Sequence, residues 1–147
     1  MVLMKIDEIL NEWKNDTELD DLNLDKESVR IPNLHAKYIT LLSNDRRLLR
    51  GYQSQKKQII SRLRNYYSGS ATQQELADLG REQFLGKTLK NEIMINVELD
   101  ESIISIDAKI SLLEVKVLAL EEIMKSINSR GYQIKNAIDW RRLTLGA

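Results

Sequence analysis

Nine basic side chains lie in residues 30–67, and their types and spacing suit the binding of anions better than any other feature of this 147-residue chain. The same stretch holds one acid, Asp45. At about 100° per residue in a helix, four of these bases fall within about 40° of one another: Arg46, Arg50, Lys57 and Arg64. Such a row neutralises phosphates without reading sequence, which favours a nucleic-acid surface. The alternative is a solvated helix face that attracts the acidic blocks of neighbouring subunits.

Charge is strongly segregated along the chain, although the net charge is zero. Residues 1–27 hold nine acids and three bases, and residues 68–122 hold eleven acids and five bases. Residues 123–147 are basic again, with five bases and one acid. This pattern indicates directed electrostatics, either between subunits or toward a polyanion.

Two adjacent aromatic residues, Tyr66 and Tyr67, end the basic stretch. Aromatic rings beside cations can hold unstacked bases, so both tyrosines are candidate DNA-binding residues. Tyr66 also continues the apolar stripe of the same helix, which favours a packing role. The sequence leaves both interpretations open.

Other chemistries lack the residues that they need. The chain has no cysteine, and His35 is its one histidine, which excludes thiol catalysis and a histidine-based zinc site. Four acids have calcium-loop spacing, but Asp21 stands where that loop requires glycine: Asp16, Glu18, Asp20 and Glu27. No glycine-rich phosphate loop or nucleophile elbow is present. We therefore expect no enzyme activity, no catalytic residue, no cofactor and no metal.

The composition predicts an all-α fold. Hydrophobic residues make up 42% of the chain and aromatic residues only 5%, and one proline and six glycines leave little turn chemistry for hairpins. We expect a single helical domain over 1–147, open and completed by copies of itself. Its parts are an acidic N-terminal helix and linker (1–30), a basic helix (33–68), a variable segment (71–100) and C-terminal oligomerisation helices (101–147).

Local signals place the boundaries of these helices. Pro32 predicts an extended entry with Asn33 as the cap of the basic helix, and Gly69 predicts its end. Thr72 and Glu75 have capping-box spacing before a short helix that Gly80 interrupts. Residues 93–99 alternate in polarity like a strand but precede a strong helical pattern, so their conformation stays open.

A coiled-coil seam runs through the C-terminal part, with apolar residues at alternating steps of four and three. We predict that this seam carries assembly, together with a final helix at 133–143 after a stop or kink at Gly131. The predicted assembly residues are Ile106, Ile110, Leu113, Val117, Leu120, Met124, Ile127, Ile134, Ile138 and Trp140.

The N-terminal ten residues carry Lys5, Asp7 and Glu8, which is atypical of a signal peptide. No apolar run approaches the roughly 20 residues needed to span a bilayer. We expect a cytoplasmic protein that has no contact with membranes.

Four stretches, in this order and spacing, resemble the UvsY-type recombination mediator proteins of T-even-like bacteriophages. The first is Trp13 with Asp16. The others are 27–38 (ESVRIPNLHAKY), 55–57 (QKK) followed by 66–69 (YYSG), and 127–141 (INSRGYQIKNAIDWR). The resemblance covers nearly the whole chain, except residues 70–100.

The resemblance implies a helical protein that forms a hexameric or heptameric ring in the cytoplasm of a phage host. It implies binding to single-stranded DNA, to a single-strand-binding protein and to a RecA-like recombinase, which is loaded onto covered strands in recombination, repair and replication. Lys56 and Lys57 match the family pattern directly, whereas Arg62 and Arg64 match it only in character. The predicted DNA-binding residues are Arg46, Arg50, Lys56, Lys57, Arg62, Arg64, Tyr66 and Tyr67.

A structural coiled-coil adaptor without DNA binding remains the alternative. In such a scaffold the basic helix would only pair with acidic neighbours.

Overall fold

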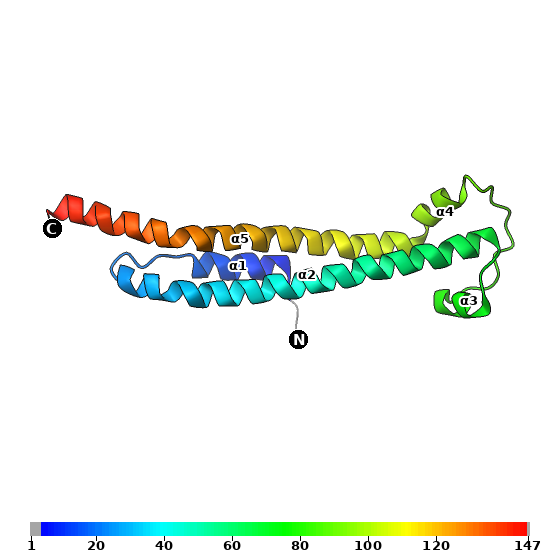
Figure 1. Ribbon diagram of the computed structural model, residues 1–147, viewed down its shortest axis with the longest axis horizontal. Coiled ribbons are helices and arrows are strands. Elements are labelled where there is room, and N and C mark those ends of the chain that lie inside the picture. Colours follow the sequence, from blue (N-terminus) through cyan, green and yellow to red (C-terminus); the bar gives the residue numbers. More distant parts are fainter. Residues whose placement is uncertain (1–3, 147) are drawn as a thin grey trace. The chain divides into compact units, whose positions relative to one another are not determined.

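The computed structural model describes residues 4–146, which form five helices and no strand (Figure 1). The helices are α1 (Ile6–Asp16), α2 (Leu24–Ser68), α3 (Gln73–Leu79), α4 (Ile93–Leu99) and α5 (Glu101–Leu145). The all-α prediction is confirmed, and the segment that the sequence left open between strand and helix is α4. Within residues 4–146, no helix combines the length and the apolar character needed to cross a membrane.

Two compact units make up the chain. The first consists of the chain up to Arg46 together with the part from Glu114 onward, and the second is Arg47–Leu113. Helices α2 and α5, of 45 residues each, contribute to both units. Because both boundaries fall inside continuous helices, no break in the sequence pattern marks them.

In the first unit, α1 lies along the N-terminal part of α2 (Figure 1). The rings of Trp13 and Tyr38 meet edge-on with centroids 5.4 Å apart. The Tyr38 hydroxyl donates a hydrogen bond of 2.8 Å to Asp16, and Lys37 Nζ lies 2.6 Å from the same carboxylate and 2.5 Å from Glu12. These contacts anchor α1 to one short stretch of α2.

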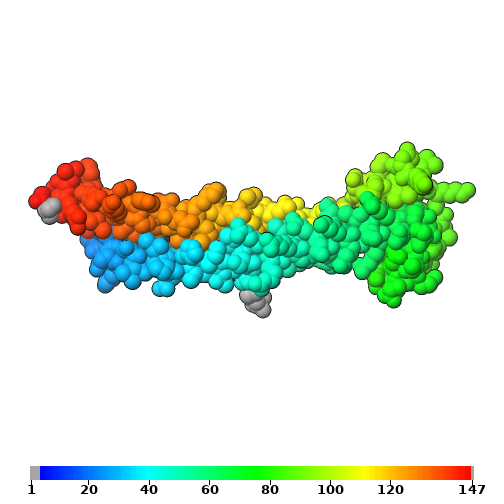
Figure 2. All heavy atoms as spheres, viewed as in Figure 1, coloured from blue at the N-terminus to red at the C-terminus, as the bar shows by residue number. Residues whose placement is uncertain are grey.

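Two buried ion pairs join α5 to the rest of the first unit. Arg130, which is 3% exposed, lies 3.1 Å from Glu27 and donates to the backbone carbonyls of Thr17 and Glu18. Lys116 lies 3.1 Å from Asp45, and both side chains are buried. Such pairs need their full set of partners, because loss of one leaves an uncompensated buried charge. In Figure 2, the cyan start of α2 and the orange part of α5 lie side by side.

The predicted extended entry at Pro32 is wrong, because α2 begins at Leu24 and contains Pro32 and Asn33. Proline inside a helix costs about 3 kcal/mol, because it lacks the N–H that would bond to the carbonyl four residues earlier, and here tertiary contacts offset that cost. Leu24 is buried, and the Arg30 guanidinium donates 2.7 Å to the Asp16 carbonyl. The linker predicted within residues 1–30 is therefore a loop between Asp16 and Leu24, followed by the first turns of α2.

Gly131 does not end or kink the C-terminal helix, and α5 runs without interruption to Leu145. Glycine inside a helix destabilises it by about 1 kcal/mol relative to alanine. The packing of the residues on either side outweighs this cost. Arg130 and Ile134 are both buried and hold the helix in place on either side of it. The final helix at 133–143 is thus the end of α5.

The second unit has an apolar core around Leu63, Val97, Ile103, Ile106 and Ile110, all buried. As predicted, Gly69 ends α2: it has φ +79°, and the next N–H, of Ser70, donates 2.9 Å to the Asn65 carbonyl.

The predicted capping box of α3 is present. Thr72 accepts a hydrogen bond from the Glu75 N–H at 3.1 Å, and the Glu75 side chain accepts from the Thr72 N–H. Figure 2 shows the green segments of α3 and its surroundings gathered against the end of α2.

Leu120 on α5 tests the core of the first unit, because it is 0% exposed. We expect Leu120→Ala to lower the free energy of unfolding by about 3 kcal/mol, since it removes apolar contacts and leaves a cavity. Urea unfolding followed by circular dichroism measures the change. Val29→Ala is the control, because Val29 is 78% exposed and its truncation should change stability by less than about 0.5 kcal/mol. Equal effects would show that the burial of Leu120 contributes nothing.

Candidate nucleic-acid interface

Three of the predicted DNA-binding cations form one solvent-exposed line on α2 in the second unit. Arg50, Lys57 and Arg64 are all exposed, and seven-residue steps keep them on one side of the helix over about 21 Å. Within residues 4–146, none of them has a carboxylate within the ion-pair distance of 4.0 Å. We call these three residues the cation row. They are free to bind phosphates.

The orientation of Arg64 is set by α4. Its Nε lies 3.0 Å from the sulfur of Met94, while the guanidinium remains exposed. Arg47, which the sequence analysis left out of the site, is a further exposed cation of the same unit. It lies about 60° around α2 from Arg50 and so borders the cation row.

The other three predicted cations have acidic partners in the chain. The ion pairs are Arg46 with Glu121 at 2.9 Å in the first unit, and Lys56 with Asp107 at 2.7 Å and Arg62 with Asp78 at 3.6 Å in the second. These side chains are between 34 and 46% exposed, so the pairs are open to solvent. A phosphate that binds these cations competes with a carboxylate already beside them.

Tyr66 and Tyr67 pack into an aromatic cluster with Phe84. The ring centroids of the three residues lie 5.0 to 5.3 Å apart, and both tyrosines are partly buried. The Arg81 guanidinium lies 5.0 Å from the centre of the Tyr66 ring. The cluster thus packs the segment after α3 against the end of α2. Both tyrosines make the contacts of packing residues.

Asp100 is the polar centre of this cluster. Its carboxylate accepts two hydrogen bonds from Arg81, at 2.7 and 2.8 Å, one from the Tyr67 hydroxyl at 2.7 Å and one from the Ser102 N–H at 2.9 Å. Burial opposes its ionisation, but the hydrogen bonds from Arg81, Ser102 and Tyr67 outweigh burial and hold the pKa of Asp100 far below its usual value. Burial and the bond to Asp100 raise the pKa of Tyr67. This network could not be predicted from the sequence, because no residue spacing links Asp100 to Arg81 and Tyr67.

The residues predicted for assembly mostly form the core of the chain itself. Eight of the ten are buried: Ile106, Ile110, Leu113, Val117, Leu120, Met124, Ile127 and Ile134. In the structure the coiled-coil seam packs within the chain, and its role in assembly stays a prediction. Ile138 is half-buried, and Trp140 is 67% exposed. The opposite face of α5 carries the exposed apolar residues Ile104, Leu112, Val115 and Leu118.

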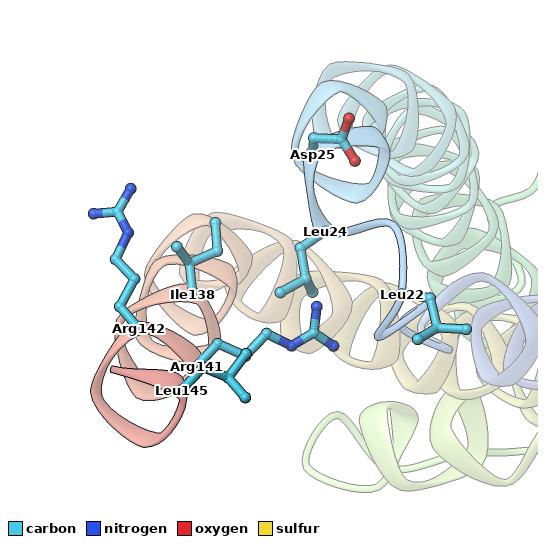
Figure 3. Close-up of a pocket in the computed structure, with 7 residues that line it drawn as sticks. All are labelled: Leu22, Leu24, Asp25, Ile138, Arg141, Arg142 and Leu145. Carbon is cyan, nitrogen blue, oxygen red and sulfur yellow. The ribbon is translucent and has the colours of Figure 1, made fainter. Parts of the chain in front are cut away.

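A groove of about 370 Å³ lies between the start of α2 and the end of α5 in the first unit (Figure 3). Its apolar lining includes Leu24 and Ile138, and Arg141 extends beneath Leu24 while Arg142 points away. Arg141 donates a hydrogen bond to the Asp21 carbonyl. None of the predicted DNA-binding residues lines the groove.

Comparison with known proteins gives one consistent result. A sequence model of the family described as the recombination, repair and single-stranded DNA-binding protein UvsY matches residues 12–147. This chain belongs to the UvsY family. The recombination protein uvsY of Enterobacteria phage T4 is 22% identical over 143 residues, which cover 97% of this chain and 99% of that protein.

Two crystal structures of the bacteriophage T4 recombination mediator protein UvsY share the fold, each with a TM-score of 0.83. Their sequence identities to this chain are 21 and 22%, and the matches cover 95 and 97% of it and 99 and 98% of the crystallised chains. The resemblance inferred from the sequence is confirmed. As a member of the UvsY family, the chain belongs among recombination, repair and single-stranded DNA-binding proteins.

Contacts within the first unit explain three of the four stretches that resemble the UvsY family. Trp13 and Asp16, the first stretch, contact Tyr38 of the second. Glu27 of the second pairs with Arg130 of the fourth. These motifs therefore maintain the fold of a UvsY-type chain, whereas the third stretch carries part of the cation row.

Three of the four acids with calcium-loop spacing bind other groups of the chain. Asp16 is bound by Lys37 and Tyr38, Asp20 accepts from the Leu22 N–H, and Glu27 pairs with Arg130. Within the described residues, no group of three or more acidic or histidine side chains could hold a metal ion.

Asp100 gives a pH-dependent test of the aromatic cluster. Its pKa is lower in the folded chain than the usual 3.8, so its charge stabilises the fold at neutral pH, and that contribution is lost as the pH falls below this value. We expect Asp100→Asn to lower the free energy of unfolding by about 2 kcal/mol at pH 7, with the difference from the wild type shrinking below about pH 4. Urea unfolding between pH 3 and pH 7 measures it.

The control for this prediction is Glu98→Gln, at an exposed acid of α4. It should change stability by less than about 0.5 kcal/mol at every pH. A difference between Asp100→Asn and the wild type that does not depend on pH would contradict the role given to the Asp100 charge.

Proposed function

We propose that this chain binds single-stranded DNA through the cation row of α2, and that it acts in the host cytoplasm as a mediator in recombination, repair and replication. In this role it helps a RecA-like recombinase to load onto strands covered by a single-strand-binding protein. The proposal rests on the row itself, three exposed cations on one side of a helix that have no acidic partner within residues 4–146. Guanidinium and ammonium groups in a line suit a flexible phosphate backbone and make no demand on sequence.

The predicted cations differ in how readily they can bind DNA, because some of them are already in ion pairs. Arg50, Lys57 and Arg64 make the first contacts, because binding to them displaces no ion pair. Lys56 and Arg62 contribute once their carboxylates are displaced. Arg46, which pairs with Glu121, contributes in the same way from the first unit. Tyr66 and Tyr67 stabilise the end of α2 and do not contact the DNA. Their rings pack against each other, and the Tyr67 hydroxyl donates to Asp100.

We also propose that copies of the chain assemble into a ring, which the family resemblance puts at six or seven subunits. Support comes from the exposed apolar face of α5, because Val115 and Leu118 are 54 and 62% exposed and find no cover within the described chain. Several linked cation rows bind one strand far more tightly than a single row does, because each binding event after the first is intramolecular.

DNA binding is tested by removing the cation row. We expect the triple variant Arg50→Gln, Lys57→Gln and Arg64→Gln to weaken binding of a fluorescent oligothymidylate about tenfold or more. The slope of log affinity against log salt should become less negative by about 2 per chain, since each lost phosphate contact removes about 0.7. Fluorescence anisotropy over a series of salt concentrations measures both quantities.

The charge-matched control is the triple variant Lys125→Gln, Lys135→Gln and Arg142→Gln, because these are exposed cations of α5 outside the predicted site. It should leave the affinity and the slope nearly unchanged. If the wild type binds no oligonucleotide even at low salt, the adaptor without DNA binding is the correct function.

Assembly is tested at Leu118. We expect Leu118→Glu to reduce the oligomeric mass in analytical ultracentrifugation and to weaken DNA binding, because a charge cannot be buried between subunits without a partner. Ser105→Glu introduces the same charge at an exposed position elsewhere on α5 and should leave the mass unchanged. A Leu118→Glu variant with the mass of the wild type would place the subunit contact on another surface.

A further inference from the structure

Two carboxylates of the second unit form ion pairs with cations of α2 that lie off the cation row. Lys56 Nζ lies 2.7 Å from Asp107 on α5, and the Arg62 guanidinium lies 3.6 Å from Asp78 on α3. Lys56 precedes Lys57 in the sequence, and Arg62 lies two residues before Arg64. At about 100° per residue, Lys56 lies about 100° around α2 from the row in one direction, and Arg62 lies about 140° from it in the other. A strand bound to the row therefore reaches these two cations only where it wraps around α2.

We propose that Asp107 and Asp78 set the affinity for single-stranded DNA by competing with phosphate for Lys56 and Arg62. This inference rests on the proposed function, because it concerns the same surface. Carboxylate and phosphate oxygens accept the same hydrogen bonds from ammonium and guanidinium groups. Each cation can therefore exchange its internal acid for the strand without a change in its own chemistry.

The exposure of these ion pairs makes the exchange possible. The four side chains are between 34 and 45% exposed, in contrast to the buried pair of Lys116 and Asp45 in the first unit. Solvent-exposed ion pairs shift an equilibrium by about fivefold at most, so a phosphate can displace these carboxylates. The buried pair would leave uncompensated charges and is not available for exchange.

Displacement also limits how tightly the strand is held. Part of the favourable interaction with each phosphate is offset by the loss of the internal ion pair. A mediator has to release its strand to another protein, and a surface with internal competitors releases it more readily than a surface of free cations. Asp107 and Asp78 are thus residues that adjust affinity without touching the DNA.

The test is a double-mutant cycle on Lys56 and Asp107 in the full chain, with a fluorescent oligothymidylate as the probe. We expect Asp107→Asn to strengthen binding two- to fivefold at about 0.15 M salt and to make the salt slope more negative by about 0.7. In the Lys56→Gln background, the same Asp107→Asn change should have no effect, because no cation remains to be released. Asp78→Asn with Arg62→Gln repeats the cycle at the second pair.

Glu101→Gln controls for the loss of one negative charge, since Glu101 is exposed on the same helix and about 120° around it from Asp107. It should leave the affinity within the error of the wild-type value. Unchanged binding by Asp107→Asn overturns the proposal, and so does equal strengthening in the wild-type and Lys56→Gln backgrounds. Failure of the wild type to bind at low salt is a separate result, which overturns the proposed function instead.

Discussion

Burial of the apolar stripe of α2 is the constraint on which the rest of the second unit depends. Leu63 is fully buried against Ile103, Ile106 and their neighbours, and this fixes which side of α2 faces the core. Cations near that side come within reach of acids on the covering helices, as Lys56 does with Asp107. Cations on the far side remain in water. The cation row is thus defined by the packing of the core as much as by its own residues.

The same constraint explains which parts of the site could be predicted from the sequence. Helical periodicity placed Arg46, Arg50, Lys57 and Arg64 in one row. The last three have no acidic partner within residues 4–146, whereas Arg46 pairs with Glu121. Lys56 and Arg62 entered through the family resemblance and lie off that row, where internal acids reach them. Periodicity carries information about faces, whereas ion pairing depends on which other helix covers each face. The partner of a cation cannot be read from the cation's own segment.

The fold shows a similar division between local and tertiary information. Gly69 ends α2 and the capping box at Thr72 begins α3, both at the positions that the sequence predicts. Both are local signals. Pro32 and Gly131 are local signals that failed, because buried contacts on either side hold the helix through them. The coiled-coil seam of α5 was found with the correct period. In the structure it packs within the chain, which the pattern alone could not state, because a heptad repeat does not specify whether the covering helix belongs to the same chain.

The arrangement of charge therefore has two levels with different consequences. Buried pairs such as Glu27 with Arg130 are strongly coupled to the fold, since loss of either partner leaves a charge out of water. Exposed pairs such as Lys56 with Asp107 contribute little to stability and can exchange partners at small cost. A net charge of zero permits both, because each basic block finds its acids elsewhere in the chain. In the proposed ring, weak binding by each chain would become strong when several chains hold one strand together, so release would depend on assembly as much as capture does.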